Sequence, residues 1–277
     1  MMAFSATWYL LEQEGLLAQS CLCNGLTALR RANLGDKKGL FYSAFFELST
    51  GFERTLKLVL ILDHMARNKL APPDSKIVED YGHKLHSLFD TAKTVCAVRG
   101  VTFLDALQTD SLPIVILGFL DNFAHPGGRY SNINKLTGHR HQSIADPIVQ
   151  WGEIVNLIIR EHATSKETQR AELNGQIASA AFGDAAASLI SDMNQQEMDV
   201  PRLFARTSEL EAAAKHAIYA LVTLIAALRD VIDTLCSSAW AANPPNASGV
   251  ADVPDMKEFL QFAWPNRRYV MRKRRWP

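Results

Sequence analysis

Several ionisable side chains on neighbouring segments could support proton transfer and anion binding. Glu53 and Lys57 are one helical turn apart, and His83 and His86 follow within a single short segment. Imidazoles titrate near neutral pH, so a histidine can act as either a proton donor or a proton acceptor. Further along the chain, Arg129 offers a guanidinium that can bind a phosphate through two hydrogen bonds. Our candidate catalytic residues are therefore His83, as a proton carrier, and Arg129, as a phosphate-binding group.

These side chains lie on or beside two segments with helical periodicity. Apolar residues recur every three to four positions from Phe41 to about Asn68, which predicts a helix. A second helix is predicted from Asp74, whose side chain can cap it, to Gly100. If the two helices pack antiparallel, His64 and His83 lie at the same end of a bundle. We expect a positively charged, imidazole-bearing pocket there, completed by the glycine-rich connector around Arg129.

Helical patterns also dominate the remaining chain. Further helices are predicted over about 5–33, 112–123 and 201–239, and another begins at Asp146-Pro147. A buried strand is the competing interpretation of the nearly all-apolar run 112–123. The polar, alanine-rich stretch 164–197 predicts shorter or looser helices. We therefore predict an all-α protein.

The least regular segment of the body is 125–145. It holds three histidines and three cations, with no acidic residue among them. Loops of this length inside a compact domain are usually functional or disordered.

The domain organisation follows from these patterns. We predict a single helical body over 1–240, with a core at about 40–160 and a helical extension at 161–240. A proline- and glycine-containing linker over 241–255 then leads to a basic, aromatic tail over 256–277.

Three motifs in the core resemble a known superfamily. They are Glu53-Arg54-Thr55-Leu56-Lys57, the segment Tyr81–Leu88, and Arg129-Tyr130-Ser131-Asn132 after a third apolar helix. Together they resemble the pattern of the HEPN superfamily (higher eukaryotes and prokaryotes nucleotide-binding). The resemblance covers roughly residues 40–160 and implies a helical bundle of the kind that commonly forms homodimers.

The same resemblance carries functional expectations. Many HEPN proteins are metal-independent ribonucleases of phage defence or toxin–antitoxin systems, and others are catalytically silent partners. Active members have a histidine a few residues after an arginine, whereas Arg129 is followed by Tyr130 and the next histidine is His139. The resemblance therefore implies a divergent ribonuclease or its silent relative, acting on RNA or a nucleotide without a cofactor.

Metal-free RNA cleavage requires a base for the 2′-hydroxyl, an acid for the leaving oxygen and a cation for the developing charge. His83 can carry the proton in either direction, and Arg129 can bind the phosphate. Around this catalytic pair, the binding candidates are Glu53, Lys57, His86, Tyr130 and Asn132.

Each candidate also has a purely structural interpretation. Glu53 and Lys57 have the spacing of a surface ion pair, which contributes only a few tenths of a kcal/mol. His83 could bond the preceding helix end, and Arg129 with Tyr130 could fasten the loop to the body. His83 and His86 lack a third ligand at a telling spacing, so no metal is expected.

The chain carries no net charge, but its C-terminal region is strongly basic. The last fourteen residues hold six cations and no acid, and Trp264, Tyr269 and Trp276 are interleaved with them or flank them. Such a mixture suits stacked bases and phosphates, and it also suits an acidic partner or the acidic body itself. The binding candidates in this region are Arg267, Arg268 and Arg272. A non-enzymatic module that uses the basic loop and tail to bind a partner protein is the second functional hypothesis, and a nucleotide-binding regulator is the third.

Composition favours a globular protein, with 48% hydrophobic and 21% charged residues. The four cysteines lack the spacing of a zinc or redox motif, so we expect reduced thiols in a cytoplasmic protein. The longest apolar run, 217–228, is about twelve residues, short of the ~20 that cross a bilayer. No membrane association is expected.

Overall fold

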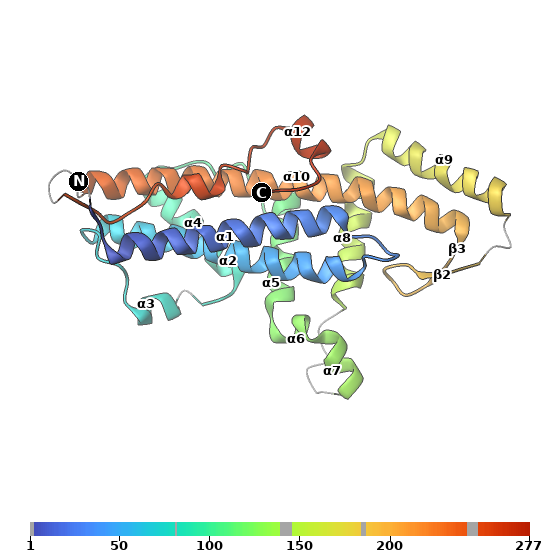
Figure 1. Ribbon diagram of the computed structural model, residues 1–277, viewed down its shortest axis with the longest axis horizontal. Helices are drawn as coiled ribbons and strands as arrows, with labels where there is room; N and C mark the ends of the chain where they lie inside the picture. The colour runs from blue at the N-terminus through green and yellow to red at the C-terminus, as the bar shows by residue number, and fades with distance from the viewer. Residues whose placement is uncertain (1–2, 81, 139–145, 184–186, 243–248) are drawn as a thin grey trace.

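Three long helices organise the molecule. The computed structural model describes residues 3–80, 82–138, 146–183, 187–242 and 249–277. Helices α1 (Ala6–Arg31), α2 (Gly39–Arg67) and α10 (Val200–Ala242) run along the long axis of an elongated bundle (Figure 1). The short connection between α1 and α2 makes these two helices antiparallel. The predicted all-α fold is confirmed.

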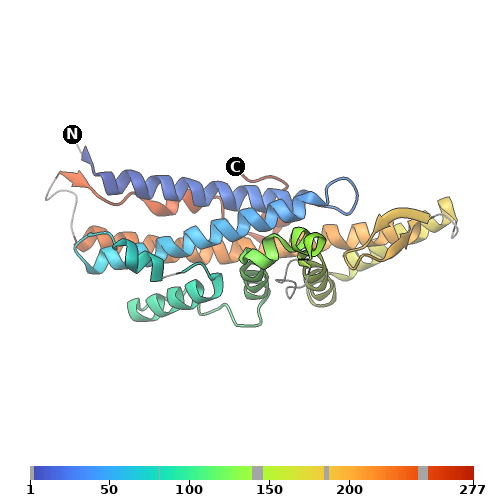
Figure 2. The ribbon, with the colours of Figure 1, turned by 90° about the horizontal axis from the view of Figure 1, so that it is seen from below.

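Shorter helices surround this trio. Helices α5 and α8 run across the long axis, and α9 packs along the N-terminal part of α10 (Figures 1 and 2). The predicted caps Asp74 and Asp146 are confirmed, because their side chains accept from the amides of Ile77 and Ile148. The shorter helices are α3 (Ser75–Asp80), α4 (Leu85–Arg99), α5 (Leu112–Ala124), α6 (Pro126–Arg129), α7 (Ser131–Thr137), α8 (Pro147–Glu161) and α9 (Ser165–Phe182).

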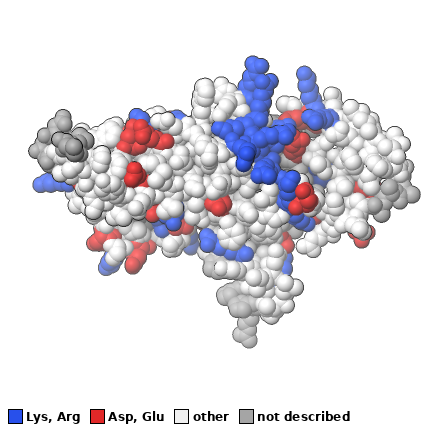
Figure 3. Space-filling view, viewed as in Figure 1, with Lys and Arg blue, Asp and Glu red and all other residues white. Residues whose placement is uncertain are grey.

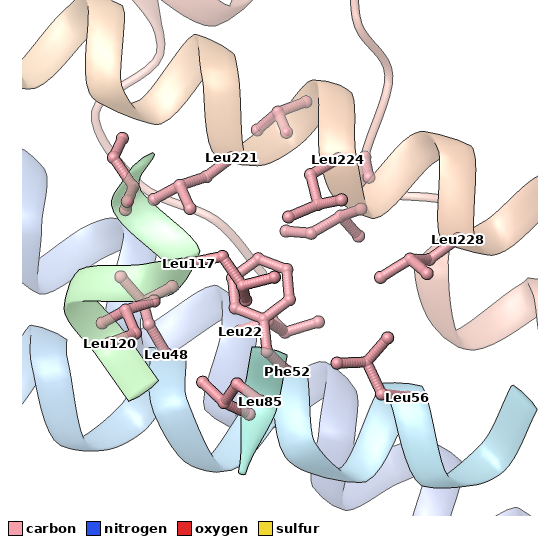
Figure 4. Close-up of a cluster of buried hydrophobic side chains, with 14 of the residues drawn as sticks. Leu22, Leu48, Phe52, Leu56, Leu85, Leu117, Leu120, Leu221, Leu224 and Leu228 are labelled. Carbon is pink, nitrogen blue, oxygen red and sulfur yellow. The ribbon is translucent and has the colours of Figure 1, made fainter. Parts of the chain in front are cut away.

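The apolar faces of the helices meet in one core. Phe52 and Leu56 of α2 lie among leucines of α1, α4, α5 and α10 (Figure 4). Helices α1 and α2 pack tightly at Gly25 and Gly51, where an added methyl group would lie 2.6–2.8 Å from a leucine side chain of the partner helix. Gly25 therefore permits close packing of α1 on α2.

The prediction of one helix over 74–100 is wrong. The chain forms α3 and α4 with a break between them, and Gly82 in the break has a φ of +67°. This left-handed conformation is accessible to glycine without the penalty that a Cβ brings. The Leu85 amide at the start of α4 donates to Asp121 Oδ1 of α5 at 2.7 Å, so a side chain from a distant segment fixes where α4 begins.

The prediction for 164–197 is correct only for its first half. Strands β2 (Ala187–Ser191) and β3 (Glu197–Asp199) follow α9 and pair antiparallel. The buried carboxylate of Asp192 closes their turn by accepting from the amides of Asn194 and Gln196. Local side-chain bonds of this kind stabilise a tight turn in place of a helix.

The C-terminal segment lies against the body. Strand β1 (Ala3–Phe4) pairs in parallel with β4 (Val250–Ala251). The chain then passes through a 3₁₀ turn, η1 (Met256–Leu260), and the helix α12 (Arg267–Arg272), which packs on α10. Part of the predicted linker, 243–248, lies outside the described residues.

Within the described residues, no helix is long and apolar enough to span a bilayer.

Candidate functional site

A cleft between α2, α4, α5 and α6 contains both candidate catalytic residues. Its volume is about 660 Å³. It is lined by Glu53, Asp80, Gly82, His83, Lys84, Ser87, Asp121, Ala124, His125 and Arg129. His83 and Arg129 therefore line the same cleft, as the sequence predicted.

The position and charge of this cleft differ from the expectation. His83 contacts Glu53, three helical turns before His64, so the cleft lies beside the middle of α2 and the two histidines do not meet at its end. Three carboxylates line the cleft together with Lys84 and Arg129, so positive charge does not dominate it. The carboxylates come from α2, the end of α3 and α5, elements that the prediction did not place together.

Glu53 holds the imidazole of His83 in place. Nδ1 of His83 lies 2.8 Å from Glu53 Oε1, and Lys57 Nζ donates to the same oxygen at 3.0 Å. Nδ1 also lies 3.5 Å from Lys57 Nζ. The His83 side chain is 83% exposed, and with Nδ1 engaged, Nε2 is the ring nitrogen that can exchange a proton with a ligand.

Glu53 is ionised at neutral pH in this arrangement. Partial burial acts to raise its pKa, but the hydrogen bonds from His83 and Lys57 outweigh burial and hold the pKa below its ordinary value. The side chains of Glu53 and Lys57 are only 20% and 18% exposed, so this is a partly buried pair and not the fully solvated surface pair of the structural interpretation.

Arg129 reaches the cleft from the short helix α6. Gly128 allows α6 to fold onto the end of α5, because a Cβ there would lie 2.6 Å from the carbonyl oxygen of Asn122. The Arg129 guanidinium lies over the Phe46 ring of α2, 5.7 Å from its centroid. Its Nε is buried and has no hydrogen-bond partner among the described residues. The guanidinium is thus fixed by packing while retaining an unused donor.

His125 is the functional candidate that sequence reasoning missed. It lies between α5 and α6 and provides a second imidazole in the cleft beside His83. In the sequence it counted only as one of three histidines in an irregular segment. The available signal was its position directly after an apolar helix and four residues before Arg129. His139, expected in the same segment, lies outside the described residues.

Lys57 and three other binding candidates lie outside the cleft lining. His86 pairs with Asp90 on α4 at 3.6 Å, and Tyr130 is 55% exposed. Asn132 Nδ2 donates to the hydroxyl of Tyr42 at 3.0 Å and so attaches α7 to α2. Burial raises the pKa of Tyr42, with the bond from Asn132 acting against it. The geometry of Asn132 matches the structural interpretation, in which this segment is fastened to the body.

The three arginine candidates of the C-terminal segment separate into two environments. The Arg267 guanidinium lies over the Tyr219 ring of α10, 5.3 Å from its centroid. Arg268 and Arg272 line a shallow groove of about 470 Å³ with Trp264, Tyr269, Asn266 and Lys273. This basic groove belongs to a face on which Lys and Arg side chains gather (Figure 3).

Comparison of the chain with family models, with curated proteins and with solved structures finds no match. The fold is an all-α bundle, and its cleft is lined by two imidazoles, a guanidinium, a lysine and three carboxylates. Membership of the HEPN superfamily stays a prediction. Among the described residues, no group of three or more His, Cys, Asp and Glu side chains is arranged to hold a metal ion.

Proposed function

We propose that this protein binds RNA and cleaves it without a metal ion in the cleft that contains His83, His125 and Arg129. The observation that carries the proposal is that two imidazoles and a partly buried guanidinium line one hollow. General acid–base cleavage needs two proton carriers and a cation in the same place. The resemblance to HEPN proteins adds RNA as the substrate class, with phage defence or a toxin–antitoxin system as the setting.

The roles follow from the contacts. His83 takes the proton of the 2′-hydroxyl, because the carboxylate of Glu53 at Nδ1 stabilises the imidazolium that forms. The 2′-oxygen attacks the phosphorus, and the bond to the 5′-oxygen breaks as His125 donates a proton to it. Arg129 and Lys84 balance the negative charge on the phosphoryl oxygens. The products are a 2′,3′-cyclic phosphate and a 5′-hydroxyl. Exchange with water then removes the proton from His83 and returns one to His125.

The basic groove on α12 is the proposed docking surface for the rest of the strand. Trp264 and Tyr269 offer faces on which bases can stack, and Arg268, Arg272 and Lys273 can contact phosphates. Salt-sensitive RNA binding that weakens in Arg268→Glu would support this role.

Degradation of RNA in the presence of EDTA tests the cleavage step. We expect His83→Ala and His125→Ala to slow cleavage by about 10²- to 10⁴-fold, the usual contribution of a general acid or base. His86→Ala is the matched control, because it removes the same type of side chain three residues along the chain and outside the cleft lining. Intact RNA after long incubation, or cleavage that survives both substitutions, would refute catalysis.

A non-enzymatic protein-binding module is the second candidate. Helix α7 projects from the body (Figure 1) and exposes Ile133 and Leu136 at 58% and 86%, beside the exposed Tyr130. Exposed apolar side chains that cluster in this way favour a protein partner. Binding of a partner protein that is lost in Leu136→Asp, with RNA left intact by the parent, would favour this function.

A homodimer in the cytoplasm completes the proposal. Helix α1 exposes Tyr9, Leu10, Leu16 and Leu17, each at least 45% accessible, and these residues recur at a seven-residue spacing. This stripe supports dimerisation through helix faces. Sedimentation equilibrium of the parent and of Leu10→Asp/Leu17→Asp tests it.

A further inference from the structure

A second hollow, of about 630 Å³, lies between the end of α1, the N-terminal part of α10 and the C-terminal segment. We call it the α1–α10 pocket. Five of its lining residues are cations and one is an acid: Arg30, Arg31, Lys37, Arg274, Arg275 and Glu211. It lies apart from the cleft of His83 and shares no lining residue with it.

Among the described residues, the buried Arg30 of this pocket has no close partner. Its side chain is 5% exposed, and the nearest acid, Glu211, is 3.8 Å away, longer than a hydrogen bond. Its Nε has no hydrogen-bond partner among the described residues. Burial lowers the pKa of Arg30, with Glu211 opposing the effect and Arg274 adding to it. A buried guanidinium is costly unless it is bonded, so an anionic ligand would complete the environment of Arg30.

Glu211 is shared too widely to neutralise the pocket. Arg30, Lys215 and Arg274 approach its Oε1 at 3.8, 3.6 and 4.0 Å, which is the range of weak ion pairs. Lys37 lines the pocket and pairs at 3.6 Å with Asp36, which is not part of the lining. The α1–α10 pocket therefore keeps an excess of positive charge.

The C-terminal segment supplies two of the five cations. Trp276 is buried, and its backbone amide donates to Thr27 Oγ1 of α1 at 3.0 Å. Anchoring Trp276 on α1 brings Arg274 and Arg275 beside the last turn of that helix. Lys273 lies over the Trp276 ring, 5.6 Å from its centroid, and reinforces the attachment.

The walls of the pocket are partly apolar. Ala32, Leu34, Leu210 and Ala214 line it along with the cations. We propose that the α1–α10 pocket binds the phosphate group of a nucleotide-sized ligand, with arginine forks on the phosphate and the apolar wall against the remainder of the molecule. Its volume is in the range of small-molecule sites, and arginine is suited to bidentate phosphate recognition. This inference does not rest on RNA cleavage.

Calorimetric titration of the full chain with ATP, adenosine and inorganic phosphate tests the inference. We expect ATP to bind at least tenfold more tightly than adenosine, and inorganic phosphate to compete with it. Arg31→Glu and Arg275→Glu should each weaken ATP binding at least tenfold, because both side chains line the pocket and are exposed enough to leave the fold intact. Arg160→Glu is the matched control, with the same charge reversal at an exposed position of α8 that lines neither the pocket nor the basic groove.

Equal binding of ATP and adenosine, or ATP binding that is unchanged in both pocket variants, would overturn the inference. Competition by RNA oligonucleotides with a 5′-phosphate or a 5′-hydroxyl distinguishes the source of the phosphate. Displacement of ATP by the phosphorylated oligonucleotide alone assigns the pocket to an RNA end, and no displacement by either assigns it to a free nucleotide. RNA cleavage by Arg31→Glu should equal that of the parent. This measurement separates a failure of phosphate binding in the α1–α10 pocket from a failure of RNA cleavage in the cleft of His83.

Discussion

Nδ1 of His83 lies 2.8 Å from Oε1 of Glu53, across 30 residues of sequence. The contact connects the break between α3 and α4 to the middle of α2, where Lys57 shares the same carboxylate oxygen. The imidazole thus gains a fixed orientation from a helix that packing already holds rigid. The same contact makes part of the folding stability depend on pH.

Glu53→Gln should remove that pH-dependent part. A folded-state pKa below the ordinary value of 4.5 adds stability above the unfolded-state pKa, and this is lost as the pH falls through the folded-state pKa. At pH 7 we expect the variant to be less stable by about 0.5–1 kcal/mol, in the range of a screened ion pair. The two proteins should converge as the pH falls below 4.5. Urea unfolding at pH 7 measures the stability difference, and urea unfolding at pH 3.5 measures its loss. Glu153→Gln on the exposed side of α8 is the control.

Asp63→Asn should destabilise the bundle where α2 meets α4. The Asp63 side chain is 5% exposed and accepts from Arg67 and from Arg99 Nε, the latter at 2.9 Å. Loss of the charge weakens two charge-assisted hydrogen bonds, so we expect a cost of about 2–3 kcal/mol. Asp90→Asn, on the exposed pair with His86, should change stability by less than about 0.5 kcal/mol. Equal urea midpoints for the two variants would contradict a structural role for Asp63.

Gly25→Ala and Gly51→Ala should each destabilise the α1–α2 packing. The new methyl group would lie 2.6 Å from the Leu48 side chain in the first variant and 2.8 Å from that of Leu22 in the second. Overpacking of this kind costs about 1–3 kcal/mol. Gly118→Ala in α5 has no atom within 4 Å of the added carbon, and we expect it to be neutral or to stabilise by up to ~1 kcal/mol. If the thermal unfolding midpoint falls in all three variants, the close approach of α1 and α2 is not the cause of the destabilisation.

The four thiols should be unreactive in the native protein at pH 8. Burial raises the pKa of Cys21 and Cys96 to about 11 and that of Cys23 and Cys236 to about 12, well above the ordinary value of 9.0. The thiolate is the reacting form, so a disulfide reagent should react slowly with folded protein and quickly after unfolding in guanidinium. Absorbance of the released thiolate follows the reaction. Rapid native labelling would show that local opening exposes one of the four.

Apolar periodicity predicted the long elements because tertiary packing agrees with it. Helices α1, α2, α5 and α10 each carry a stripe or run of apolar residues, and all four were expected with nearly correct bounds. The break at Gly82 was missed because its cause is the Asp121 carboxylate, 36 residues away. The β2–β3 hairpin was missed for a similar reason, since Asp192 reads as an ordinary polar residue in an alanine-rich stretch.

The candidate site was only partly visible in the sequence. His83 and Arg129 could be paired because residue type and helix order suggested it, but the acidic lining from Asp80 and Asp121 could not be inferred without coordinates. The α1–α10 pocket was missed altogether. Arg30 resembles any cation in the last turn of a helix, where the helix dipole favours positive charge, and its burial depends on α10 and the C-terminal segment.

The central position of α10 has a consequence for biosynthesis. Helices α1, α2, α5 and α8 all pack against α10, yet α10 begins only at residue 200. At typical translation speeds the ribosome needs roughly 10–35 s to proceed from the end of α2 to the end of α10, and during that interval the nascent chain exposes the apolar surface that α10 later covers. The nascent polypeptide is therefore most exposed to aggregation in the interval before its closing helix emerges.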